Sequence, residues 1–157
     1  MAVVSSKQTD EDLKVLNYAE DLLEYTFDIC HREKNVTETK DGQKTKAKAS
    51  VFPKKYWSCF TSHIIELAAS AYEDLYWANE VRLDRSTTPE MFRERISHQE
   101  RAIASLKTML PKITFAWHRF SISTNSIEYW TGLIVKTVNK AKNWNLSDKR
   151  RYEEMRK

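Results

Sequence analysis

The sequence predicts an all-α protein, an up-down four-helix bundle in a single domain. Its 157 residues include only two glycines and three prolines, which disfavours a turn-rich β fold and allows long uninterrupted helices. Apolar residues recur at spacings of three and four in four segments, which is the pattern of amphipathic helices. A chain of this length can bury a core without disulfides or a metal. Four such helices are typical of a bundle.

The first helix is expected to begin near residue 10, with Thr9 or Asp10 as its N-cap. Residues 1–9 are polar and predicted to be disordered. The four-helix domain is therefore expected to span residues 10–146. The apolar stripe of the first helix consists of Leu13, Leu16, Ala19 or Glu20, Leu23, Phe27 and Cys30.

Residues 33–50 interrupt this pattern, because they are polar, contain Asp41-Gly42 and end in alternating lysines. We expect a long flexible loop here, whose lysines are either simply solvated or in contact with a polyanion. Pro53 then fits the first turn of a second helix, where its missing N–H costs nothing. The apolar stripe of this helix consists of Phe60, Ile64, Leu67, Ala71, Leu75 and Ala78.

Thr88-Pro89-Glu90 predicts the start of the third helix, with Thr88 as N-cap and proline at the first position. Pro111 predicts a kink or a terminal region. Ser123 is the expected cap of the fourth helix, and residues 147–157 form a charged, partly disordered tail. The third stripe is Met91, Phe92, Ile96, Ile103, Leu106 and Leu110, and the fourth is Ile127, Trp130, Leu133 or Ile134, Val138 and Ala141.

The charge is unevenly distributed along the chain. The formal net charge is +4, but residues 1–30 carry two lysines against seven acidic residues, so the remainder carries +9. This asymmetry predicts a basic surface for a polyanion, separate from an acidic first helix; a merely solvated charged face is the alternative. The candidate nucleic-acid or partner contacts are Lys54, Lys55, Arg82, Arg85, Arg93, Arg95, Arg101, Lys107, Lys112, Arg119, Lys136 and Lys140, with Lys142 a further cation of the last helix.

Such a surface neutralises phosphates without reading bases, so binding would depend strongly on salt. Exposed aromatic side chains, if present, could stack on unpaired bases. The five tryptophans are expected in the core or in a subunit interface.

No catalytic motif is recognisable in the sequence. Two glycines cannot build a phosphate-binding loop, and neither a GxSxG nor an HExxH motif occurs. His63 and Glu66 resemble half of a bundle di-iron site, but the second copy is missing. We therefore expect no catalytic residue, no metal and no cofactor.

The cellular location is predicted from the cysteines and from hydropathy. Cys30 and Cys59 do not form a disulfide framework, which favours reduced thiols in a cytoplasmic protein. The N-terminal segment lacks the apolar core of a signal peptide. No apolar run is long enough to span a membrane.

Several motifs together resemble one known family. Phe52-Pro53-Lys54-Lys55-Tyr56 precedes a helix that closes with Tyr76-Trp77-Ala78-Asn79-Glu80, and the last helix carries Tyr129-Trp130 and Lys142-Asn143-Trp144. This ordered set, over about residues 12 to 146, resembles the accessory variability determinant proteins of diversity-generating retroelements. The chain departs from that family in residues 33–50, in the glycine pair usual before Trp144 and in its charged tail. Proteins encoded in ribosomal-RNA intervening sequences belong to the same superfamily, but their usual Asn-Ile-Ala-Glu-Gly-like stretch is absent here.

The resemblance implies a non-catalytic protein that assembles into a pentameric, ring-like barrel of four-helix bundles. It further implies that the basic surface binds RNA or cDNA and the element's reverse transcriptase, in support of mutagenic retrohoming, the copying of a template repeat into a variable gene. The alternative is a structural or protein-interaction bundle, including a ribosomal-RNA-associated member of the superfamily, without a reverse transcriptase partner.

Overall fold

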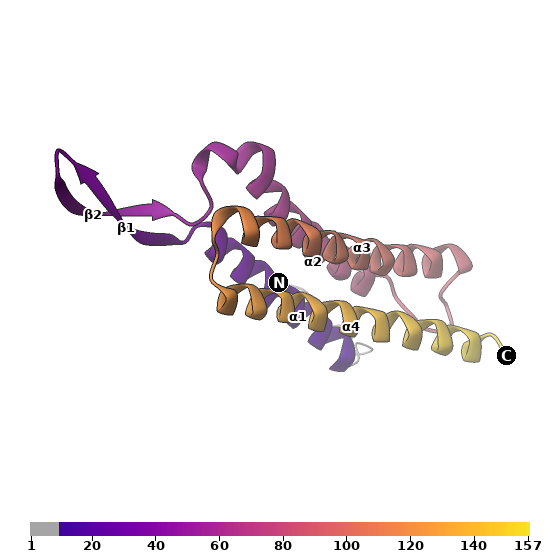
Figure 1. Cartoon of the computed structure of the whole chain (residues 1–157). Helices are drawn as coiled ribbons and strands as arrows, with labels where there is room; N and C mark the ends of the chain where they lie inside the picture. Colours follow the sequence, from indigo (N-terminus) through magenta and orange to yellow (C-terminus); the bar gives the residue numbers. More distant parts are fainter. Residues whose placement is uncertain (1–9) are drawn as a thin grey trace.

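The computed structural model describes residues 10–157, with side chains from residue 14 onward. The protein is mostly helical, with four long helices and one small two-stranded sheet. The helices lie side by side along one long axis, and the sheet projects beyond one end of them (Figure 1). The helices are α1 (Asp10–Cys30), α2 (Ser62–Glu80), α3 (Pro89–Phe120) and α4 (Thr124–Met155). The predicted N-terminal tail and Thr9, one of the two candidate caps, lie outside the described residues, and Asp10, the other candidate, is the first residue of α1.

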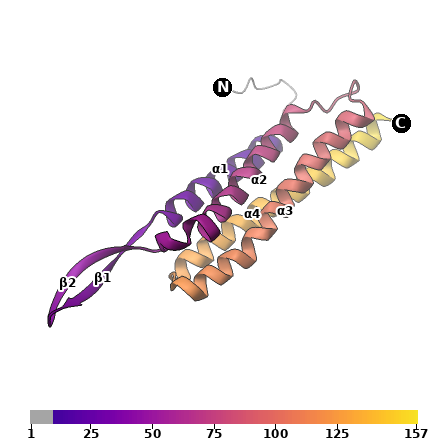
Figure 2. The ribbon, with the colours of Figure 1, turned by 90° about the horizontal axis from the view of Figure 1, so that it is seen from above.

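The helices pack as a bundle in which α1 and α3 each contact both α2 and α4. Successive helices run in opposite directions, so the end of α1 meets the start of α4, where the Trp130 indole donates to the Thr26 hydroxyl at 3.0 Å. Figure 2 shows the same arrangement from above. The predicted bundle is thus confirmed in outline, and the sheet is a correction to the all-α class.

The predicted loop at residues 33–50 was wrong, because this segment folds as a β-hairpin. Strands β1 (Glu33–Lys40) and β2 (Gln43–Ser50) pair antiparallel, with Lys40 opposite Gln43 at the tip. Asp41 and Gly42 make the two-residue turn with positive φ angles of 53° and 78°, as a type I′ hairpin requires. Gly42 is favoured in this conformation because it has no Cβ.

The predictions of where α3 and α4 begin and end are confirmed in part. The Thr88 and Ser123 hydroxyls accept hydrogen bonds from the backbone N–H groups of Met91 and Ser126, at 3.1 and 3.3 Å, which confirms both caps. By contrast, Pro111 lies exposed inside a helix that continues to Phe120, so it marks no terminus.

The predicted disordered tail is instead the last turns of α4, which continue to Met155. Tyr152 is buried there and stacks on Phe92 of α3, with ring centroids 3.9 Å apart. This contact between two aromatic rings gives the charged segment an apolar side, and an apolar side is what a helix needs to dock on a bundle.

The predicted apolar stripe of α1 is only partly the buried one, since Ala19 and Cys30 belong to the core. Val15, Leu22 and Ile29 are fully buried, whereas Phe27 of the predicted stripe is 52% exposed. The first helix is apolar over a wide arc, so spacing alone did not fix which stripe faces inward. The other stripes contribute to the core as expected, through residues such as Ile64, Ala71, Leu75, Leu106, Ile127, Trp130, Ile134 and Ala141.

A buried ion pair joins three helices at the end of the bundle opposite the hairpin. Arg95 of α3 is 3% exposed, and its Nε donates to Asp148 Oδ2 of α4 at 2.7 Å. Its Nη1 donates to the backbone carbonyls of Ala78 and Val81 at 3.2 and 2.8 Å. These carbonyls lie at the C-terminal end of α2, where a helix can no longer satisfy its own carbonyl groups fully. Gln99 also donates to Asp148 Oδ2, at 2.6 Å. These hydrogen bonds compensate the desolvation of the pair.

Removing one partner of this pair should be strongly destabilising. Asp148→Asn keeps the shape but leaves the buried Arg95 charge uncompensated, which typically costs about 3–5 kcal/mol. Urea denaturation followed by circular dichroism measures the free energy of unfolding. The control is Lys149→Gln, since the exposed Lys149–Glu100 pair at 3.5 Å should contribute less than about 1 kcal/mol. Similar losses for both variants would contradict a structural role for the buried pair.

Candidate nucleic-acid interface

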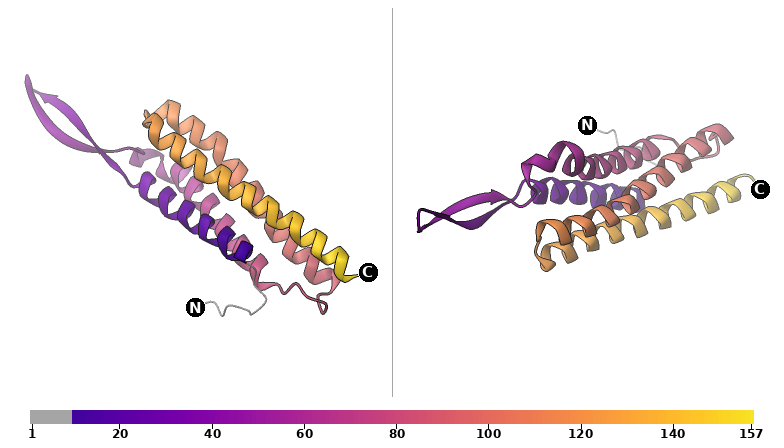
Figure 3. Two further views of the ribbon diagram at one scale, coloured as in Figure 1. Left: turned by 90° about the horizontal axis from the view of Figure 1, so that it is seen from below. Right: turned by 45° about the horizontal axis from the view of Figure 1, so that its top comes forward.

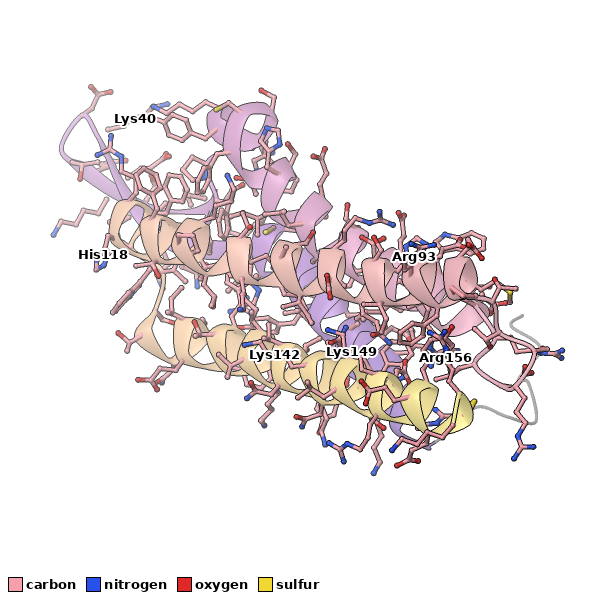
Figure 4. The ribbon with its side chains drawn as sticks, turned by 90° about the vertical axis from the view of Figure 1, so that its right-hand side faces the viewer. Lys40, Arg93, His118, Lys142, Lys149 and Arg156 are labelled. Carbon is pink, nitrogen blue, oxygen red and sulfur yellow. The ribbon has the colours of Figure 1, made fainter. Side chains whose placement is uncertain are left out.

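The structure leaves most of the predicted basic residues accessible. Nine of the twelve are exposed, and Lys112 and Lys140 are half-buried. Figure 4 shows how widely basic side chains are spread, with Lys40 and His118 at one end of the molecule and Arg93 and Arg156 at the other. Because they are spread over both ends of the molecule, their local surroundings decide which of them can bind a polyanion.

Arg95 was wrongly predicted to be a surface contact. Its guanidinium is enclosed by Asp148, by the end of α2 and by the Trp144 ring, whose centroid lies 4.9 Å away. A phosphate cannot reach it without opening the core. A charged residue on the inner face of a helix has the same sequence signature as one on the outer face, so the spacing of the basic residues did not predict that Arg95 is buried.

Several other cations are already paired with acidic side chains. Arg82 lies 3.3 Å from Asp84, Arg93 lies 3.3 Å from Glu90, and Arg101 lies 3.5 Å from Asp74. Each pair reduces the local positive potential, even though exposed pairs contribute little to stability. Lys55, Lys112 and Arg119, by contrast, form no ion pair with any described residue.

These three cations surround an aromatic pocket beside the base of the hairpin. After Pro53 the chain makes a 3₁₀ turn, η1 (Lys54–Tyr56), and a π-helical turn, η2 (Trp57–Thr61), before α2 begins. The two turns bring their aromatic residues against the end of α3. The resulting pocket of about 260 Å³ is lined by Tyr56, Cys59, Phe60, Phe115, Arg119 and Phe120.

The rings of the pocket pack against one another and leave one ring open to solvent. Tyr56 stacks on Phe120 with centroids 5.8 Å apart, and Phe60 contacts Phe115 at 5.4 Å. Phe115 remains 55% exposed. A partly exposed ring held in place by neighbouring rings provides a ready surface for stacking, at little entropic cost.

The cations lie directly on these rings. Lys55 Nζ is 5.0 Å from the centroid of Tyr56, and Lys112 Nζ is 5.8 Å from that of Phe60, within the range of cation–π attraction. Arg119 lines the pocket itself. Lys112 also lines an adjoining hollow together with Glu66, the nearby acid, which pairs with His63 at 3.4 Å. We call Lys55, Tyr56, Phe60, Lys112, Phe115 and Arg119 the aromatic–cationic pocket.

This combination of groups suits an unpaired nucleotide. Base–aromatic stacking is tolerant of sequence, and flanking lysines and arginines neutralise the phosphates. Lys55, Lys112 and Arg119 were among the predicted contacts, whereas Phe60 was assigned to an apolar helix stripe and Phe115 was given no role in binding. The contact between Phe60 and Phe115 depends on how η2 packs against the end of α3, which no local pattern reveals.

A second concentration of positive charge lies where α3 and α4 meet. The hydrogen bond to Lys107 and the charge of Lys107 lower the pKa of Lys142, with a smaller contribution from burial. The positive charges of Lys107 on α3 and Lys142 on α4 thus influence each other. An anion between them would relieve their repulsion.

Comparison of the chain with protein-family models, with curated proteins and with solved structures found no match. Among the described residues, no group of three or more His, Cys, Asp or Glu side chains is placed to hold a metal ion. In the same part of the chain, no helix has the length and apolar character needed to cross a membrane.

The two cysteines should differ sharply in reactivity. Cys59 is exposed at the pocket, whereas Cys30 is buried, and burial raises the pKa of its thiol to about 12. A disulfide reagent at pH 8 should therefore modify one thiol rapidly in the native protein and both after unfolding, because the thiolate is the reactive form. Cys59→Ser should abolish the rapid reaction, and two rapid reactions in the native protein would contradict the structure.

Proposed function

We propose that this protein is a non-catalytic accessory subunit of a reverse transcriptase, of the accessory variability determinant kind, that binds RNA or cDNA through its basic surface. In this role it supports the mutagenic retrohoming of a diversity-generating retroelement. The observation that carries the nucleic-acid part is the aromatic–cationic pocket, in which Lys55, Lys112 and Arg119 surround partly exposed rings. The retroelement part depends on the family resemblance of the sequence.

One segment of the chain belongs both to the family resemblance and to the pocket. Phe52-Pro53-Lys54-Lys55-Tyr56, the first motif of the resemblance, supplies Lys55 and Tyr56 to the pocket. Stacking and phosphate contacts carry little sequence information. Sequence-tolerant binding suits a subunit that keeps a polymerase on varied templates.

Stacking and charge can be separated by mutation. Phe115→Ala should weaken binding to a single-stranded RNA oligonucleotide about 5- to 150-fold, since one stacked base is worth about 1–3 kcal/mol. It should leave the salt dependence unchanged. Lys112→Gln with Arg119→Gln should instead reduce the slope of log affinity against log salt by about 1.4. Fluorescence anisotropy at several salt concentrations measures both quantities.

Tyr129→Ala is the matched control, because Tyr129 is 58% exposed but lies on α4, outside the pocket. An RNA affinity that does not change with salt concentration, or unchanged affinity in all the pocket variants, would exclude the proposed interface. Absence of RNA binding by both the pure protein and its complex with the polymerase would exclude the nucleic-acid role. Neighbouring genes without a reverse transcriptase and paired near-repeats would favour the alternative, a structural or protein-interaction bundle.

The proposal includes assembly into a ring-like homopentamer. Large aromatic side chains are also exposed on α1 and α2, with Phe27 at 52% and Trp77 at 56%. Aromatic residues of this kind are enriched in protein interfaces. Light scattering should give a mass of about five times the 18.5 kDa of one chain, and a monomer at all concentrations would contradict the assembly.

A further inference from the structure

The hairpin extends from the bundle as an arm whose side chains are mostly exposed to solvent. In Figures 1 and 3 it extends beyond the helices in every view. Every residue of β1 except Val36 is exposed. The arm is anchored only at its base, where Val51 and Phe52 are buried and the Val51 N–H donates to the Arg32 carbonyl at 2.8 Å. A segment this exposed contributes little to the core.

The register separates the charges between the two faces of the arm. Lys44, Lys46 and Lys48 alternate along β2 and therefore share one face. Their partners across the ladder are Thr39, Thr37 and Asn35, none of which is charged. The acid on this face is Glu33, which lies at the base of the arm opposite Ser50. We call Lys44, Lys46 and Lys48 the lysine face.

The opposite face has a mixed character. It carries Lys34, Glu38 and Lys40 in alternation along β1, opposite Ala49, Thr45 and Gln43. Lysines on exposed strands commonly prevent edge-to-edge aggregation, and this mixed face already serves that purpose. Protection from aggregation does not require three like charges at spacings of about 6.7 Å on the other face. The segregation of charge therefore favours binding to a polyanion.

The arm and the aromatic–cationic pocket belong to one end of the molecule. Phe52, at the base of the arm, contacts Phe120 with ring centroids 5.7 Å apart, and Phe120 lines the pocket. Each strand has eight residues, so the arm reaches about 26 Å from its base. A nucleic-acid strand seated in the pocket has several phosphates within that distance.

We propose that the hairpin is a nucleic-acid-binding arm, which lays its lysine face along the phosphate backbone of the strand held at the aromatic–cationic pocket. The inference rests on the nucleic-acid part of the proposed function and adds a second contact to it. Three ammonium groups in a row neutralise phosphates without reading bases. The contact is therefore electrostatic and independent of sequence, and it strengthens binding most at low salt.

The chain offers a matched pair of variants for the test. Lys44→Gln with Lys48→Gln removes two charges from the lysine face, one near the tip and one near the base. Lys34→Gln with Lys40→Gln removes two charges at equivalent heights on the opposite face. The first variant should reduce the salt slope for single-stranded RNA by about 1.4, equivalent to roughly 25-fold weaker binding at 0.1 M salt. The second should leave the slope unchanged.

Circular dichroism and the urea midpoint should match the wild type for both variants, because all four side chains are exposed. Equal losses of RNA affinity in the two variants would show a response to net charge alone and would contradict the proposed role of the arm. If the lysine-face variant binds RNA as tightly as the wild type while Phe115→Ala binds more weakly, the proposed role of the arm is wrong and the proposed function is retained. A wild-type protein that binds no RNA would overturn both.

Discussion

The buried pair of Arg95 and Asp148 is the constraint on which the far end of the bundle depends. Removing both charges from water costs several kcal/mol per ion before any compensation. The compensation here is nearly complete, because Asp148 also accepts from Gln99, and Gln99 in turn accepts from Asn145 at 3.1 Å. Since these residues come from α3 and α4, satisfying all of them fixes the axial register of the two helices.

The same pair explains how α2 ends and how α4 becomes so long. Arg95 supplies donors to the carbonyls of Ala78 and Val81 at the C-terminal end of α2, where a helix can no longer satisfy its own carbonyl groups fully. Asp148 can meet Arg95 only if α4 continues past the segment assigned to the four-helix domain by apolar spacing. Tyr152, one turn further on, then packs on Phe92. A charged sequence that reads as a tail is therefore helical for reasons of tertiary structure.

The sequence predicted what depends on local chemistry and missed what depends on distant partners. Thr88 and Ser123 cap helices through contacts three residues away, and both were identified. The hairpin was missed because β2 alternates lysines with small residues instead of apolar with polar ones, although Asp41-Gly42 is itself a hairpin signal. The inner face of α1 was identified only in part because the apolar arc of this helix is wide. The roles of Arg95 and Phe115 depend on their contacts with Asp148 and Phe60, which lie more than fifty residues away in the sequence.

The fold places the acidic first helix and the basic third helix on different sides of the bundle. The acidic side chains of α1, such as Glu20, Glu24 and Asp28, are exposed. Because α1 packs on α2 and α4 while α3 packs on the same two helices, α1 and α3 occupy opposite corners of the bundle. The distribution of charge therefore favours a polyanion on the α3 side, where Lys112 and Arg119 lie, over the α1 side. In the proposed function, this field would orient an approaching strand toward the aromatic–cationic pocket, at the end of the molecule opposite the buried ion pair.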